Sequence, residues 1–140
     1  MARVPDHFYT QSAVLPFRIE RGSLEFLLIT SRRKKRWVLP KGVVELQLAP
    51  ADSAAKEALE EAGIEGRVSE EPIGRYQYEK WDGTCSVEVF SMAVETAHDS
   101  WPESYRDRCW VGPTDAAARV SEPELKRIIL EFADTFQTGG

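Results

Sequence analysis

Lys56-Glu57-Ala58-Leu59-Glu60-Glu61-Ala62-Gly63-Ile64 is the stretch that decides the fold of this sequence. It completes a helix that we predict from Pro50 to Gly63, because proline suits the first helical turn and glycine suits the left-handed residue that ends a helix. At about 100° per residue, one stripe of this helix carries small or apolar side chains: Ala55, Ala58, Leu59 and Ala62. We expect this stripe to pack closely against a sheet.

Three carboxylates of the same helix lie within reach of one another, because Glu57, Glu60 and Glu61 occupy positions i, i+3 and i+4. Like charges at this spacing repel, and the last two also lie near the negative end of the helix dipole. A divalent cation would turn this repulsion into ligation, and carboxylate oxygens suit Mg²⁺ or Mn²⁺. From the residues alone, the alternative is a solvated acidic face.

Counted from Gly42, these residues resemble the signature box of the Nudix hydrolases. That box reads Gly, five residues, Glu, seven residues, then Arg-Glu-apolar-any-Glu-Glu-any-Gly-apolar, and this chain follows its register without a gap. Two positions depart from it: Leu48 stands where the box has its first glutamate, and Lys56 stands where it has arginine. Lysine lacks the two-pronged guanidinium of arginine, and leucine has no carboxylate to accept hydrogen bonds from such a group. The two departures can therefore be interpreted as the loss of one arginine–glutamate interaction.

Shorter strings of the chain resemble one branch of that family, the diphosphoinositol polyphosphate and diadenosine polyphosphate phosphohydrolases. These strings are Ser12–Arg18, Leu28–Arg32, Trp37–Gly42, Tyr78–Lys80, Trp101–Glu103 and Arg108–Val111. The resemblance implies a single Nudix domain over residues 1–140, with a core at about 12–136. It implies an α/β (α+β) fold in which helices sandwich a mixed β-sheet.

For the site, the resemblance implies a metal-dependent pyrophosphohydrolase in which water attacks the phosphorus of a phosphoanhydride. Glu57, Glu60, Glu61 and the carbonyl of Gly42 would hold Mg²⁺ or Mn²⁺, and Glu57 and Glu60 are the candidate catalytic residues. The general base stays open, because three glutamates outside the helix are further candidates that the sequence does not separate: Glu45, Glu79 and Glu88.

A polyphosphorylated substrate is strongly anionic, so the site needs cations in an otherwise acidic protein. Residues 32–36 are five consecutive cations, and the shorter strings contain further basic residues. We therefore predict substrate contacts from basic side chains whose type suits phosphate, namely Arg18, Arg32, Arg36, Lys41 and Lys80. For the run of five cations, a solvated hairpin tip is the alternative.

The 140 residues carry 18 basic and 23 acidic side chains, a net charge of −5 and 42% apolar residues, as a compact globular domain does. No apolar run approaches the roughly 20 residues of a bilayer span. The start of the chain lacks the features of a secretory signal, so we expect a cytoplasmic protein. The acidic balance makes nucleic acid an unlikely partner in this reading, and the sequence leaves the oligomeric state open.

Apolar alternation predicts strands at residues 13–20, 24–31, 37–39, 73–81, 84–95 and 109–111, and a final helix at 121–136. The strand at 24–31 is so apolar that we expect both of its faces to be covered. Asp82-Gly83 predicts a two-residue hairpin turn.

Three functional hypotheses follow from the sequence. The first is a metal-dependent pyrophosphohydrolase acting on a diphosphoinositol polyphosphate or a dinucleoside polyphosphate. The second is a Nudix-fold module that binds a nucleotide or polyphosphate but has lost chemistry through Leu48 and Lys56. The third is a nucleic-acid-associated protein that uses the basic run, which predicts steeply salt-dependent binding.

Overall fold

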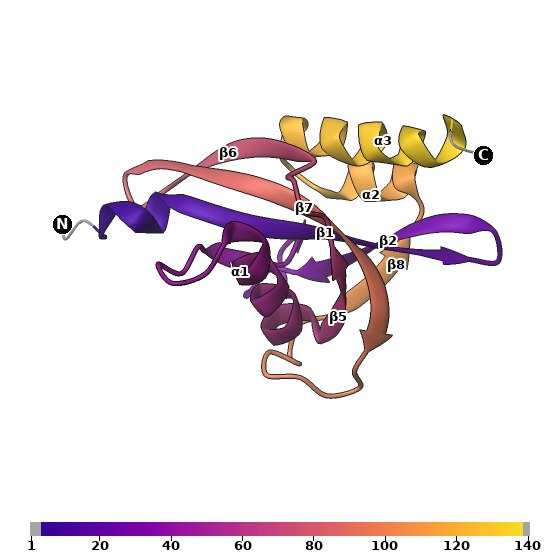
Figure 1. The fold of residues 1–140 in the computed structure, drawn as a ribbon, viewed down its shortest axis with the longest axis horizontal. Coiled ribbons are helices and arrows are strands. Elements are labelled where there is room, and N and C mark those ends of the chain that lie inside the picture. The colour runs from indigo at the N-terminus through magenta and orange to yellow at the C-terminus, as the bar shows by residue number, and fades with distance from the viewer. Residues whose placement is uncertain (1–3, 139–140) are drawn as a thin grey trace.

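The computed structural model describes residues 4–138 and joins the predicted strands in one eight-stranded mixed sheet (Figure 1). Its main path follows the order β3 (Trp37–Val38), β2 (Ser23–Thr30), β1 (Thr10–Glu20), β7 (Gly83–Ala97) and β5 (Ile64–Val68). Three further strands extend it: β4 (Lys41–Val43) pairs with β1, β6 (Gly74–Lys80) with β7, and β8 (Arg108–Val111) with β2. The neighbours β1 and β7 are parallel, whereas β1 and β2 are antiparallel.

Helices cover both faces of this sheet, which confirms the predicted fold class. On one face lies α1 (Pro50–Glu57), which continues into the π-helical turn η2 (Ala58–Ala62). On the other lie α2 (Pro113–Arg119) and α3 (Pro123–Thr138), as Figure 1 shows. A 3₁₀ turn, η1 (Asp6–Tyr9), leads into β1. No helix within residues 4–138 is long and apolar enough to cross a membrane.

The central strands divide their side chains between two cores, because successive residues of a strand point to opposite faces. On β1, Val14 joins the core under α1 while Leu15 joins the core under α2 and α3. On β2, Leu27 and Leu28 divide in the same way, and all four residues are at most 1% exposed. The expectation that the second strand is covered on both faces is therefore confirmed.

The acidic helix differs from its prediction in its last turn. Residues 58–62 form a π-helical turn, and the amide of Gly63, in the left-handed region with φ 67°, bonds back to the carbonyls of Ala58 and Leu59. Ala54, Ala58 and Ala62 form the buried stripe, whereas Leu59 is 37% exposed, so its predicted place on this stripe is wrong. Because Ala54 and Ala58 lie on the buried face, Leu59 is about 100° around the helix from Ala58, toward the exposed side.

The turn between β6 and β7 lies one residue earlier than the predicted turn at Asp82-Gly83. Lys80 pairs with Gly83, and the two turn residues are Trp81 and Asp82, with φ of 55° and 58°. Positive φ at both central residues is the geometry of a type I′ turn. Gly83 starts the next strand beneath the ring of Tyr9, where a Cβ would lie 2.5 Å from Tyr9 Cε1. Glycine is therefore used here for close packing rather than for its φ.

Candidate active site

A cleft of about 700 Å³ opens beside the acidic helix and gathers side chains of both charges. Its carboxylates are Glu57, Glu60, Glu61 and Glu103. Its cations are Arg32, Arg33, Lys35, Arg36, Lys41, Lys80 and Arg106. The fold thus brings the acidic helix, the basic β2–β3 hairpin and the end of β6 to one place.

Gly42 forms a cradle for the carboxylate of Glu57. A Cβ at residue 42 would lie 2.5 Å from Glu57 Oε1 and 2.6 Å from Oε2, so only glycine leaves room for the carboxylate in this position. On β1, Ser12 pairs with Gly42, and residues paired in this way share one face of the sheet. The buried Ser12 Oγ has no hydrogen-bond partner among the described residues. The cradle therefore has an unsatisfied hydroxyl on its face of the sheet.

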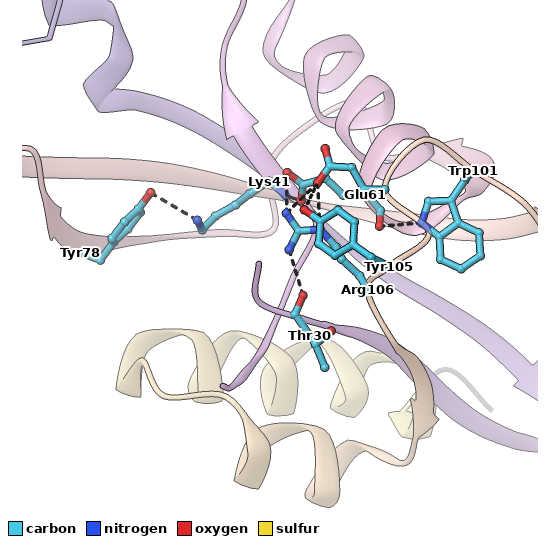
Figure 2. Close-up of polar contacts among 8 residues, drawn as sticks. Thr30, Lys41, Glu61, Tyr78, Trp101, Tyr105 and Arg106 are labelled. Carbon is cyan, nitrogen blue, oxygen red and sulfur yellow. Dashed lines mark hydrogen bonds and ion pairs between the residues drawn. The ribbon is translucent and has the colours of Figure 1, made fainter. Parts of the chain in front are cut away.

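Glu57 and Glu61 are both held in environments that oppose their ionisation. Burial raises the pKa of Glu57 to about 7, and the like charges of Glu61 and Glu60 add to this effect. Burial also raises the pKa of Glu61 to about 7, although the Arg106 charge and a hydrogen bond from the Lys41 amide counteract it. That amide donates to Glu61 Oε1 over 3.2 Å (Figure 2).

Arg106 is a buried cation, 6% exposed, that lines the cleft. Its Nε and Nη2 donate to Glu103 Oε1 at 3.0 and 2.9 Å, and its Nη1 donates to the Thr30 carbonyl at 2.9 Å. Nη2 also lies 3.8 Å from Glu61 Oε2 (Figure 2). Neither Arg106 nor Glu103 was predicted from the sequence to have a role. Only the string Trp101–Glu103 pointed to this segment.

Lys41 lies on the other side of Glu61 from Arg106. Its Nζ donates to the Tyr78 hydroxyl over 3.3 Å and lies 4.6 Å from the centre of that ring (Figure 2). Tyr78 in turn donates to Oε1 of the buried Gln11 at 2.7 Å. Burial, with the Lys80 charge, lowers the pKa of Lys41. The lysine is therefore a partly desolvated cation whose attraction to a phosphate would be weakly screened.

Four of the five predicted substrate contacts line the cleft: Arg32, Arg36, Lys41 and Lys80. Arg18 does not line it. Arg18 forms an ion pair with Glu25 at 2.8 Å and stacks on Trp110 at 4.2 Å, on the far half of β1. These partners already satisfy its charge, and we leave Arg18 out of the proposed substrate contacts.

The three open candidates for the general base, Glu45, Glu79 and Glu88, lie outside the cleft lining. Glu79 accepts from Thr84 at 2.6 Å, and Glu88 pairs with Arg75 at 2.8 Å. Glu45 pairs with Lys56 at 2.5 Å. Lys56, which replaces the arginine of the box, therefore has a carboxylate partner on the loop even though Leu48 offers none.

The carboxylates of Glu57 and Glu61 and the carbonyl of Gly42 are oxygen donors of the kind that a hard divalent cation prefers. Within residues 4–138, no three carboxylate, histidine or cysteine side chains converge as a ready-made metal cluster. Glu57, which lies against Gly42, and Glu61, which accepts from the Lys41 amide, are nevertheless the carboxylates whose pKa is raised by burial and like charge, which a cation would relieve. The glycine cradle brings the Glu57 carboxylate against the Gly42 backbone, and the Ser12 hydroxyl, unpartnered among the described residues, is a further oxygen donor on the same face of the sheet.

Comparison with known proteins decides the family, because the profile of the NUDIX domain matches residues 9–132. The chain belongs to the Nudix family. Among curated Nudix relatives, Nudix hydrolase 21, chloroplastic, of Arabidopsis thaliana is 35% identical over 84% of this chain, which spans 63% of that protein. Diphosphoinositol polyphosphate phosphohydrolase 3-beta of Bos taurus is 30% identical, with 97% of this chain and 82% of that protein covered.

Solved structures give the same Nudix architecture. An Ap4A hydrolase of C. elegans in a binary complex superimposes with a TM-score of 0.78 at 23% identity, and the match covers 94% of this chain and 98% of that chain. A MutT protein of Methanosarcina mazei superimposes with a TM-score of 0.69 at 22% identity over 91% of this chain and 94% of that chain. These structures establish the fold, a mixed sheet between helices.

Proposed function

We propose that this Nudix protein is a metal-dependent pyrophosphohydrolase that cleaves a phosphoanhydride bond in a polyphosphorylated small molecule. One observation carries the proposal: the cleft joins the carboxylates of the box helix to seven cations in one space. Carboxylates suit a divalent cation, and the basic side chains suit the phosphates of the substrate. The relatives named above support a diphosphoinositol polyphosphate or a dinucleoside polyphosphate as that substrate.

The residues of the acidic helix have separate tasks in this proposal. Glu57, Glu61 and the Gly42 carbonyl would hold Mg²⁺ or Mn²⁺, whose charge would polarise a water and the phosphoryl oxygens. Glu60, which has a solvent-accessible side chain in the same cleft, serves as a further ligand or as the general base. The base candidates outside the cleft lining already have partners in Lys56, Thr84 and Arg75, so we prefer Glu60.

The cations of the cleft hold the phosphates on either side of the bond that is broken. Lys41 is the most buried of those predicted from the sequence and lies beside Glu61, so we assign it to the phosphate nearest the reacting centre. The exposed cations of the β2–β3 hairpin that line the cleft contact the outer phosphates: Arg32, Arg33, Lys35 and Arg36. Exposed charges act more weakly and are screened by salt, so these contacts affect affinity more than chemistry.

A catalytically impaired binding module is the second candidate, and one observation favours it. Glu61 is tied to the Lys41 amide and lies near Arg106, while the described residues show no converged cluster of metal-ligating side chains. If those ties persist when a divalent cation is added, the cleft would bind a polyphosphate without cleaving it.

A substrate panel separates the two candidates. Diadenosine polyphosphates, diphosphoinositol polyphosphates, ADP-ribose and nucleoside triphosphates are incubated with the protein and Mg²⁺ or Mn²⁺, and phosphate or nucleotide release is measured. Metal-dependent turnover that is lost in Glu57→Gln supports the hydrolase and ranks its substrates. Absence of turnover with all substrates, together with ligand-induced thermal stabilisation, would instead support the binding module.

A further inference from the structure

The segment of residues 98–108, here called the clamp segment, bonds to the end of the acidic helix at four successive carbonyls. The last carbonyls of a helix have no partner within the helix itself. Here each receives a donor: Glu103 N to Glu60 O at 3.0 Å, Trp101 Nε1 to Glu61 O at 3.0 Å, Arg108 Nη1 to Ala62 O at 3.0 Å, and His98 N to Gly63 O at 2.8 Å. Figure 2 shows the bond from Trp101.

Packing reinforces these bonds. The Trp101 ring lies directly on Gly63, where a Cβ would be 2.7 Å from Trp101 Cγ. The guanidinium of Arg108 lies 4.0 Å from the centre of the Trp101 ring on its way to the Ala62 carbonyl. The indole thus contacts both the helix cap and a second donor of the same clamp segment.

The clamp segment also reaches the side chain of Glu61. Arg106 lies 3.8 Å from Glu61 Oε2 and is fixed by its bonds to Glu103 and to the Thr30 carbonyl. The backbone and the carboxylate of Glu61 are therefore both held by one segment that is about forty residues away in the sequence.

The bonded helix end is the π-helical turn at 58–62, which carries two of the three box carboxylates. A π turn is rare, and the same residues could instead form a regular α-helical turn. Return to that register would rotate Glu60 and Glu61 relative to Glu57, because each residue advances about 100° around an α-helix.

We propose that the clamp segment is a positioning device that holds the π turn in register and so sets where Glu60 and Glu61 point. Trp101, Arg106 and Arg108 are its anchors. They are positioning residues, because they act through the carboxylates. The inference rests on the proposed metal-dependent function for its effect on catalysis, but the effect on the turn itself does not depend on that function.

The test compares Trp101→Phe with Trp110→Phe in the full chain. The first removes the indole donor to Glu61 O, while the second removes the same volume from an indole that donates no hydrogen bond among the described residues. Arg108→Met, which removes the donor to Ala62 O, is an independent second variant. Three quantities are measured: amide hydrogen exchange at residues 58–63, Mn²⁺ affinity from the EPR signal of free Mn²⁺, and kcat and KM for the best substrate.

We expect Trp101→Phe and Arg108→Met to accelerate exchange at residues 58–63 and to weaken Mn²⁺ binding about three- to tenfold, as the loss of one hydrogen bond predicts. kcat should fall while KM changes little, because the cations of the cleft are untouched. Trp110→Phe should leave all three quantities near wild type.

Unchanged exchange at residues 58–63 in both clamp variants would overturn the inference. Accelerated exchange with unchanged Mn²⁺ affinity and kcat would also overturn it, because the turn would then be held without consequence for the carboxylates. If the wild-type protein itself binds no Mn²⁺ and turns over no substrate, the proposed function fails. The exchange comparison then decides by itself whether the clamp segment holds the turn.

Discussion

Gly42→Ala is the substitution whose effect can be worked most directly from the structure. A Cβ at residue 42 would lie 2.5 Å from Glu57 Oε1, whereas ordinary van der Waals contact begins at 3.4 Å. The carboxylate of Glu57 must therefore move by about 1 Å, or rotate out of the cradle. Metal ligands are placed to within roughly 0.2 Å. A displacement of about 1 Å near a reacting centre costs on the order of a hundredfold in rate.

We accordingly expect kcat/KM of Gly42→Ala to fall by about a hundredfold and its Mn²⁺ affinity to fall with it. Thermal stability should change little, because the carboxylate is displaced from a site in which burial and like charge already oppose its ionised form. The matched control is Gly112→Ala, where a Cβ meets nothing within 4 Å. The assays are steady-state hydrolysis of the best substrate, Mn²⁺ titration and thermal unfolding of both variants.

The reasoning is refuted if Gly42→Ala keeps kcat/KM within about threefold of Gly112→Ala. That result would mean that the position of Glu57 against the Gly42 backbone has no bearing on catalysis. A large loss of thermal stability in Gly42→Ala, absent from the control, would also contradict it. The glycine would then serve folding instead of the carboxylate.

Four further predictions concern charge. The pKa values of Glu57 and Glu61 are raised to about 7, and metal binding requires the ionised carboxylates. The affinity for Mn²⁺ should therefore rise steeply from about pH 6 to about pH 8. A titration that gives the same affinity at every pH would contradict this prediction. Without metal, the raised pKa makes the folded state bind the proton more tightly than the unfolded state, so stability is lost as the pH rises from 4.5 through about 7. Glu57→Gln should therefore raise Tm at pH 8 but not at pH 4, as calorimetry would show. Arg33→Gln should raise KM in low salt with kcat retained, and a loss of kcat alone would refute its role in binding. The double substitution Leu48→Glu with Lys56→Arg should change kcat/KM less than about fivefold, because Lys56 already forms an exposed ion pair with Glu45. A larger gain in kcat/KM would show that the two departures from the box impair catalysis.

The sequence predicted the parts of the fold that follow a strong local period. The apolar run of β2 and the left-handed Gly63 cap are both found where local patterns placed them. The π turn that follows Glu57 was not predictable, because its register depends on donors supplied by a distant segment. Leu59 is exposed for a different reason, because the buried face is centred on Ala54, Ala58 and Ala62, about 100° away from it around the helix.

The short elements β4, β5 and α2 were not predicted, because each is held by pairing or packing with distant residues more than by its own pattern. β4 matters most for the site, since its pairing with β1 places Gly42 against the acidic helix. Arg106 was missed because a single arginine in a loop has no periodic or motif context. Its burial and its bonds to Glu103 and Thr30 are visible only in three dimensions.

The central claim is that the carboxylates of the box helix support metal-dependent attack of water on a phosphoanhydride. Its most direct measurement is ³¹P NMR of the best substrate in ¹⁸O-labelled water, with wild type and Glu61→Gln, in Mn²⁺ and after its removal by chelation. The account predicts product phosphate that carries the isotope in wild type with Mn²⁺, and no product without metal or in Glu61→Gln. Turnover that survives chelation, or that is undiminished in Glu61→Gln, would contradict it.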